Sequence, residues 1–178
     1  MNKISEFDLD AISAIRRNVE SFMLYVAKKY AGLGGFLLDI APQDHKGAFP
    51  FFNNVTIETL DIDPASGADY IVDLCQCKDV IDSNRFDYVV CTEVLEHTLQ
   101  PFDAVDGIYH VLKSGGYAFV STPFNFRIHG PLPDCWRFTE YGLRSLFKDF
   151  EIVELIESKT FDRWLMPLQY TLVVRKPL

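Results

Sequence analysis

Hydrophobic residues return at helical spacing in the first part of the chain. Between residues 8 and 31, apolar side chains recur at steps of three and four, while charged side chains take the other face. The apolar set is Ile12, Ile15, Val19, Phe22, Met23, Val26 and Tyr30. The glycines at positions 32, 34 and 35 suit the end of that helix. The pattern predicts one amphipathic helix within residues 1–34, packed on a single domain formed by residues 35–178.

From residue 35 onward, short apolar runs alternate with segments of helical character. The runs that predict strands are, in chain order, 36–40, 55–61, 70–73, 86–91, 117–122, 151–157 and 170–175. Alternation of strands with helical crossovers indicates an α/β fold with a doubly wound, mostly parallel seven-stranded sheet. The last two runs have no helix between them, which predicts a loop-linked antiparallel pair at one edge of the sheet, with an antiparallel terminal strand.

Two of the crossover helices carry start and stop signals. Pro101 suits the first turn of a helix that Gly115 and Gly116 would end. Its expected buried face is Phe102, Val105, Ile108, Val111 and Leu112. A further helix, about residues 139–147, has Thr139 as its expected N-cap.

Composition and charge narrow the class of protein. The chain has 178 residues, of which 48% are hydrophobic and 14% aromatic, as expected of a globular domain with a core. A formal net charge of −8 argues against a nucleic-acid partner, because such a surface needs a basic footprint. The sequence shows neither a signal peptide nor an apolar run long enough to cross a bilayer. These features predict a cytoplasmic protein that binds neither nucleic acid nor membrane.

The four cysteines occur without a secretory context, so reduced thiols are expected. Cys75 and Cys77 have neither the spacing nor the second pair of a zinc site. No metal site is predicted.

Polar side chains gather where the fourth apolar run ends. The strand through Cys91 leads directly into Thr92 and Glu93, and Glu96 and His97 follow one turn later. Ligands of open α/β sheets bind outside the carboxyl ends of the strands. This segment is therefore a candidate site.

Aspartates close the first three strands of the predicted sheet. Asp61 follows Asp39 by 22 residues, close to the ~20 expected between a nucleotide-binding turn and the acid that takes the ribose hydroxyls. Asp73 closes the third strand. For each aspartate alone, turn formation or helix capping is the alternative. The ordered series favours a cofactor site.

Three segments resemble class I S-adenosylmethionine-dependent methyltransferases. Residues 86–97 read FDYVVCTEVLEH and resemble that family's FDxVxxxEVLEH strand. Residues 112–124 resemble its LKPGGxxxxxTPF segment, and residues 129–139 resemble the HxxPxDxWRFT element of one bacterial subgroup. The resemblance implies a Rossmann-like methyltransferase fold with S-adenosyl-L-methionine as the cofactor.

The resemblance also implies roles for individual residues. Asp61 would hold the ribose hydroxyls, and Asp73 would face the adenine amino group. Ile62 and Leu74 would pack on the adenine ring. The other expected cofactor residues are Asp39, Ala41, Thr92 and Glu93.

The first loop departs from the family's D-x-G-x-G pattern. Ala41 stands in place of the first glycine and Gln43 in place of the second. Glycine is needed where φ is positive or where a Cβ would meet the ligand. Cofactor binding that is weakened, altered or lost is therefore an open alternative, as is a catalytically degenerate binding protein with this fold.

The acceptor side is expected in the proline-rich loop after the fifth strand. His129 and His97 are the candidate general bases, because histidine titrates near neutrality. His45 lies in the altered first loop, and His110 is expected on the surface of a helix. Arg127 and Arg137 would orient an anionic acceptor, with pairing of Arg137 to Asp134 within the loop as the alternative.

The function that this sequence supports is methyl transfer from S-adenosylmethionine to a small-molecule oxygen, nitrogen or carbon nucleophile. A nicotinamide-dependent oxidoreductase would share the architecture. That class of enzyme carries a GxGxxG turn, which this chain lacks.

Overall fold

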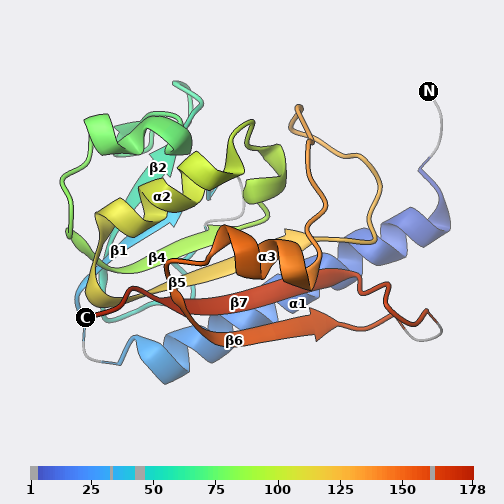
Figure 1. The fold of residues 1–178 in the computed structure, drawn as a ribbon. Helices are drawn as coiled ribbons and strands as arrows, with labels where there is room; N and C mark the ends of the chain where they lie inside the picture. The colour runs from blue at the N-terminus through green and yellow to red at the C-terminus, as the bar shows by residue number, and fades with distance from the viewer. Residues whose placement is uncertain (1–3, 33, 43–46, 161–162) are drawn as a thin grey trace.

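A computed structural model describes residues 4–32, 34–42, 47–160 and 163–178. Its centre is one seven-stranded sheet in the order β3-β2-β1-β4-β5-β7-β6 (Figure 1). The strands are β1 Phe36–Ile40, β2 Thr56–Asp61, β3 Tyr70–Ile71, β4 Phe86–Thr92, β5 Leu112–Pro123, β6 Glu151–Ser158 and β7 Gln169–Arg175. The pairs among β1 to β5 are parallel, and β7 runs antiparallel to both of its neighbours. The predicted α/β fold is confirmed.

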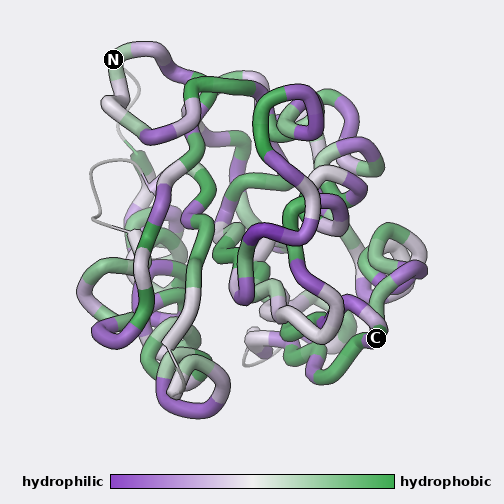
Figure 2. The backbone as a smooth tube through the Cα atoms, turned by 90° about the vertical axis from the view of Figure 1, so that its left-hand side faces the viewer, coloured by the Kyte–Doolittle hydropathy of each residue, from purple (hydrophilic) through white to green (hydrophobic). Residues whose placement is uncertain are grey.

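Helices cover both faces of the sheet (Figure 1). On one face lies α1, Glu6–Tyr30, and on the other lie α2, Pro101–Val111, and α3, Glu140–Leu146. Two short 3-10 helices, η2 at Leu74–Asp79 and η3 at Leu95–His97, follow β3 and β4. Both colours of Figure 2 occur along the helical turns, as expected of helices with one face against the sheet.

The helix ends follow the chemistry of their first residues. Ser5 caps α1 by accepting the N–H of Asp8 at 3.1 Å, and Thr139 caps α3 by accepting the N–H of Gly142 at 3.1 Å. The predicted Thr139 cap is confirmed. Pro101 is the first residue of α2, where its missing N–H costs nothing.

Two hydrophobic clusters fill the layers. The larger lies between the sheet and α2, α3 and η2, and includes Phe86, Ile108 and Phe147. The second lies between the sheet and the C-terminal half of α1, where Phe22, Met23 and Val26 meet residues such as Phe119. Burial on both faces explains the continuous apolar runs of β4 and β7.

Several boundaries differ from the sequence prediction. β3 ends at Ile71, because Asp73 accepts the N–H of Cys75 at 2.9 Å and starts η2. α2 ends at Val111, and Leu112 already belongs to β5, so the glycines at 115 and 116 lie in a strand. The expectation that Phe102 is buried was wrong, since 60% of it is exposed.

His110 was expected to be a surface residue and is half-buried instead. Its Nε2 lies 3.0 Å from the carbonyl oxygen of Ile81. The four cysteines are free. Among the described residues, no helix is long and apolar enough to cross a membrane.

The register brings the predicted site residues to one edge. In β1, Asp39 pairs with Thr59 of β2 on one side and with Val90 of β4 on the other. Parallel strands in this register end together, so the residues that follow β1, β2 and β4 share the carboxyl edge of the sheet.

Candidate active site

A cavity of about 690 Å³ opens at the carboxyl ends of β1 and β4. Its walls come from α1, from the loop after β1, from the Thr92–Glu93 step, and from Phe126 and residues 129–131. Of the residues predicted from the sequence, the cavity is lined by Asp39, Ala41, Thr92, Glu93, His97 and His129. Residues of four separate segments therefore meet around one space.

The loop after β1 keeps a left-handed turn without the expected glycine. Ala41 has φ of 51°, and its N–H donates to the carbonyl oxygen of Leu60 at 2.7 Å. An L-residue pays roughly 1–2 kcal/mol for this conformation, which glycine adopts freely. The backbone at position 41 thus has the left-handed conformation that the family's glycine would adopt. Gln43 and His45 lie outside the described residues.

A hydrogen bond from the loop to Asp39 fixes the position of this loop. Its side chain is 1% exposed, and Oδ2 accepts the N–H of Ala48 at 2.6 Å. Burial raises the pKa of Asp39 from 3.8 to about 7, against the opposing effect of the Ala48 hydrogen bond.

Gly47 is a cavity residue that sequence reasoning missed. Its φ is 47°, and a Cβ there would collide with Oδ2 of Asp39 and lie 2.5 Å from Cβ of Pro42. The loop can pass close to Asp39 only because position 47 has no side chain. Gly47 lies further along the chain than the two glycines of the D-x-G-x-G pattern, so the pattern did not predict this role.

The residues expected at the adenosine end lie at the end of β2 and just after β2 and β3, outside the residues that line the cavity. Asp61 is buried and accepts the N–H of Asp63 at 2.9 Å, and Ile62 beside it is 67% exposed. Asp73 caps η2 through the N–H of Cys75. Leu74 is 4% exposed and packs in the larger hydrophobic cluster.

Glu93 is held at the end of β4 in a left-handed conformation, with φ of 55°. Its Oε1 accepts hydrogen bonds from Ser121 Oγ and from Gln169 Nε2, both at 2.7 Å. Burial raises the pKa of Glu93 above its ordinary value, although both hydrogen bonds oppose the shift. Gln169 was not predicted, because it reaches the site from β7, far away in the sequence.

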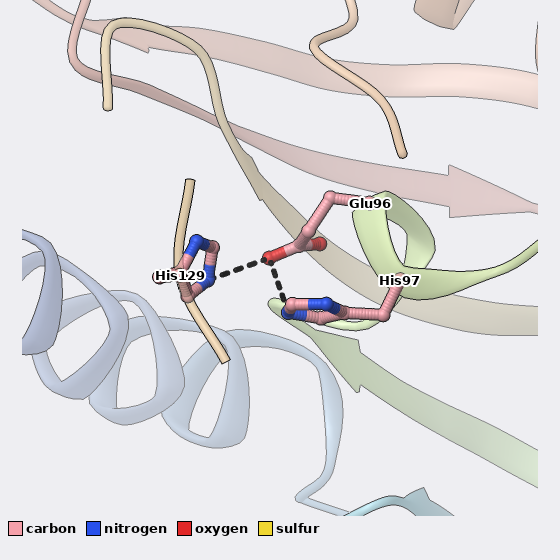
Figure 3. A group of neighbouring side chains, drawn as sticks. All are labelled: Glu96, His97 and His129. Atoms are coloured by element: carbon pink, nitrogen blue, oxygen red, sulfur yellow. Dashed lines mark ion pairs between the residues drawn. The ribbon is translucent and has the colours of Figure 1, made fainter. Parts of the chain in front are cut away.

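Three neighbouring side chains converge beside this carboxylate, as Figure 3 shows for Glu96, His97 and His129. Oε1 of Glu96 lies 3.7 Å from Nε2 of His97 and 3.8 Å from Nε2 of His129. Glu96 is 0% exposed, and burial raises its pKa well above the ordinary value, with a further contribution from the charge of Glu93. One ligand atom from each of the three side chains lies within 4.8 Å of the others, so the group could hold a metal ion.

The other nitrogen of each imidazole has its own neighbour. Nδ1 of His97 lies 2.9 Å from the carbonyl oxygen of Pro133, and Nδ1 of His129 lies 3.1 Å from Oδ2 of Asp134. Burial lowers the pKa of His129, while the charge of Asp134 opposes that shift.

The loop that carries His129 is tied down by Arg137. The guanidinium binds Asp134 through two hydrogen bonds of 2.5 and 2.7 Å, and it also donates to the carbonyl oxygens of Phe126, Arg127 and Trp136. This pairing depresses the pKa of Asp134 below its usual range. The alternative that Arg137 pairs within the loop thus describes its observed contacts, and Arg137 is absent from the cavity lining.

Arg127 is also absent from the cavity lining. Its Nη1 lies 3.3 Å from Oδ2 of Asp8, at the start of α1. The pair joins α1 to the loop and leaves the side chain partly exposed.

The N-terminal half of α1 forms a wall of the cavity, through Ile12, Ile15, Arg16, Val19 and Glu20. The sequence predicted the helix and its apolar face but not this use of it. A periodic pattern shows which side chains share a face, and the same pattern serves a core and a cavity wall.

Comparisons with known proteins agree on one class. Residues 18–173 match a family model described as a methyltransferase domain. The comparison with curated proteins gave no match. Similar solved structures include a SAM-dependent methyltransferase from Methanosarcina mazei, with 16% identity, a TM-score of 0.66, and coverage of 86% of this chain and 97% of that chain.

Two further structures show the range of proteins with this fold. The N-methyltransferase NodS from Bradyrhizobium japonicum WM9 is 15% identical, with a TM-score of 0.66 and coverage of 93% of this chain and 98% of that chain. The [4+2]-cyclase SpnF is 16% identical, with a TM-score of 0.69 and coverage of 88% and 80%. At such identities the likeness shows the fold alone. Because the family model spans most of the chain, the protein belongs to the methyltransferase domain family and is an S-adenosylmethionine-dependent methyltransferase.

Proposed function

We propose that this enzyme methylates a small molecule that binds at the His97 and His129 end of the cavity. The observation that carries the proposal is the shared cavity, where the first-loop residues Asp39 and Ala41 and the two imidazoles line one space. A volume of about 690 Å³ falls within the ~300–1,000 Å³ typical of small-molecule pockets.

The residues present fit the cofactor. Ala41 supplies the left-handed turn and Gly47 the close backbone approach, so the first loop retains the conformations for which glycine is usually needed. We assign Asp39, Ala41, Thr92 and Glu93 to the methionine end of the cofactor, and Asp61, Ile62, Asp73 and Leu74 to its adenosine end. The retained turn favours an active enzyme over a degenerate binding protein.

The bound cofactor supplies an electrophilic methyl group on a sulfonium, which is already a good leaving group. The task of the protein is to hold the acceptor atom in line with that methyl carbon and to ease the loss of the acceptor's proton. His97 and His129 are the imidazoles that line the cavity among the described residues. We therefore assign the handling of the acceptor to them, and not to Arg127 or Arg137, which contact the protein itself.

Two measurements test the proposal. S-adenosylhomocysteine should bind to the purified chain in calorimetry and raise its melting temperature, by an amount equivalent to about 2.7 kcal/mol at 100 times the dissociation constant. With an acceptor found by screening small metabolites, His129→Asn should retain cofactor affinity and lower turnover by roughly 10²–10⁴. Absence of S-adenosylhomocysteine binding would refute the cofactor site, and a fully active His129→Asn enzyme would refute the acceptor assignment.

A further inference from the structure

The carboxylate of Glu96 lacks the partners that a buried charge requires. It is 0% exposed, and neither Oε1 nor Oε2 has a hydrogen-bond partner among the described residues. Burial of an unpaired carboxylate costs several kcal/mol. The Nε2 atoms of His97 and His129 lie 3.7 and 3.8 Å from Oε1 of Glu96, beyond hydrogen-bond length (Figure 3).

The hydrogen bonds of an imidazole's Nδ1 indicate whether its Nε2, the atom that faces Glu96, carries a proton or a lone pair. The carbonyl oxygen of Pro133, 2.9 Å from Nδ1 of His97, can only accept a hydrogen bond, so that Nδ1 carries the proton. In a neutral ring the other nitrogen then bears a lone pair. Nδ1 of His129 lies 3.1 Å from Oδ2 of Asp134 but makes no hydrogen bond, so this contact does not fix the tautomer of His129. Nε2 of His97 thus presents a lone pair to the buried carboxylate, and a cation held between Glu96, His97 and His129 would satisfy all three groups.

We propose that Glu96, His97 and His129 bind one divalent first-row transition-metal ion. Two nitrogens and one carboxylate oxygen form a set that suits zinc, iron, cobalt or nickel better than magnesium or calcium. A tetrahedral ion with bonds of about 2.0–2.2 Å holds its ligand atoms roughly 3.3–3.6 Å apart, so the distances of 3.7 and 3.8 Å from Oε1 of Glu96 need only small side-chain shifts.

The surroundings of the histidines match those of metal ligands. A ligating histidine commonly donates its second N–H to a carbonyl or carboxylate, which fixes the ring and its tautomer. His97 has the carbonyl oxygen of Pro133 in that place, and His129 has Asp134 within 3.1 Å but without a hydrogen bond. Backbone bonds also fix the turn, because Cys135 N–H donates to the carbonyl oxygen of Glu96 at 2.7 Å.

A shared proton is the simplest competing explanation. A protonated imidazole beside the carboxylate, or a protonated Glu96 beside a neutral imidazole, would satisfy the site without an ion. The competing explanations differ in a measurable way, since only the metal site binds an added ion.

The ion would extend the proposed function, and this step rests on it. His97 and His129 line the cavity, so the open coordination positions of the ion would face the acceptor. A hydroxyl oxygen bound there loses its proton to solvent more readily. That oxygen then forms a bond to the methyl carbon as the carbon–sulfur bond breaks and S-adenosylhomocysteine leaves. The favoured acceptors are therefore molecules with a metal-coordinating hydroxyl group.

The test uses the full chain, stripped with a chelator, and titrated with Zn²⁺ or Co²⁺ in a calorimeter. We expect one ion per chain and a visible Co²⁺ spectrum typical of nitrogen and oxygen ligands. Glu96→Gln, His97→Asn and His129→Asn should each weaken binding by more than the roughly 10- to 100-fold that loss of an outer partner costs. Melting temperatures identify any variant that fails to fold, and the two histidine variants keep the test valid if Glu96→Gln does not fold.

Two control variants address chance binding. His110 is a half-buried histidine outside the cluster, and Cys135 is an exposed thiol in the same loop as His129. His110→Asn and Cys135→Ser should bind Co²⁺ as the parent chain does. A Co²⁺–thiolate absorption band that disappears in Cys135→Ser would overturn the proposal. The absence of binding at 100 μM metal would also overturn it, because the dissociation constant would then be at least ~10⁴ times that of a 10 nM site.

Binding of S-adenosylhomocysteine to the same preparations separates this proposal from the proposed function. Metal-free protein that binds S-adenosylhomocysteine but no ion would refute the metal site alone. Protein that binds the ion but not S-adenosylhomocysteine would refute the cofactor site and leave the metal site standing.

Discussion

The buried carboxyl group of Asp39 should make the protein less stable as the pH rises. In the folded chain its pKa is about 7, whereas the unfolded value is near 3.8. Between these values the folded state binds more protons than the unfolded state, so the free energy of unfolding falls with increasing pH. The full interval, at 1.36 kcal/mol per pH unit, corresponds to about 4 kcal/mol.

Asp39→Asn removes this titration but keeps an oxygen that can accept the N–H of Ala48. A neutral amide in the same buried place carries a cost that does not depend on pH. The stability of the variant relative to the parent should therefore rise by about 2–3 kcal/mol between pH 5 and pH 8. Urea unfolding of the ligand-free protein, followed by circular dichroism at several pH values, measures this difference.

Asp63→Asn is the matched control. Asp63 accepts the N–H of Ala65 at 2.8 Å but is exposed, so the substitution removes an acid of similar local geometry without removing a buried one. Its stability curve should run parallel to that of the parent chain. Parallel curves for Asp39→Asn as well would show that Asp39 is ionised in the fold at neutral pH, contrary to our reasoning.

Three further substitutions probe the loops. Ala41→Gly should raise stability by up to about 1 kcal/mol in urea unfolding, since relief of a left-handed strain of roughly 1–2 kcal/mol exceeds glycine's entropy cost of about 0.5–1 kcal/mol; a loss of stability would contradict the positive φ. Gly47→Ala should lower the melting temperature and S-adenosylhomocysteine affinity more than Gly67→Ala, which shares a positive φ but has open space around it; equal effects would dismiss the clash. Arg137→Ala should cost about 3 kcal/mol, because it leaves Asp134 buried without its partner; thermal unfolding unchanged from the parent would show that the pair contributes little.

The sheet and its functional edge could be predicted because both depend on local pattern. β1 was predicted at its observed bounds, since an apolar run bounded by glycine and a polar turn has few alternatives. The acids and the Thr92–Glu93 step at the strand ends then indicated the site, because parallel strands end at a common edge. The observed seven-stranded sheet confirms the predicted fold.

Contacts between distant segments could not be predicted in the same way. Gln169 binds Glu93 across 76 positions of the chain, and no spacing rule connects β7 with the end of β4. Gly47 lets the loop backbone lie close to Asp39, but it stands at a position where the family's D-x-G-x-G pattern has no glycine. The sequence placed Glu96 beside His97, but only the fold shows that its carboxylate turns inward toward His129.

The two walls of the cavity, the His129 loop and α1, differ in the number of hydrogen bonds and ion pairs that would have to break before they could move to admit a ligand. The loop with His129 shares backbone bonds with η3, an indole bond from Trp136 to the carbonyl oxygen of Thr98 at 2.7 Å, and the Arg137 pair. The facing wall is the first half of α1, whose ion pair with that loop, Asp8 to Arg127 at 3.3 Å, is of an exposed kind worth about 0–1 kcal/mol. The His129 loop thus keeps the acceptor end of the cavity at a defined size. Displacement of the first half of α1 costs less free energy, so ligands exchange more readily on that side.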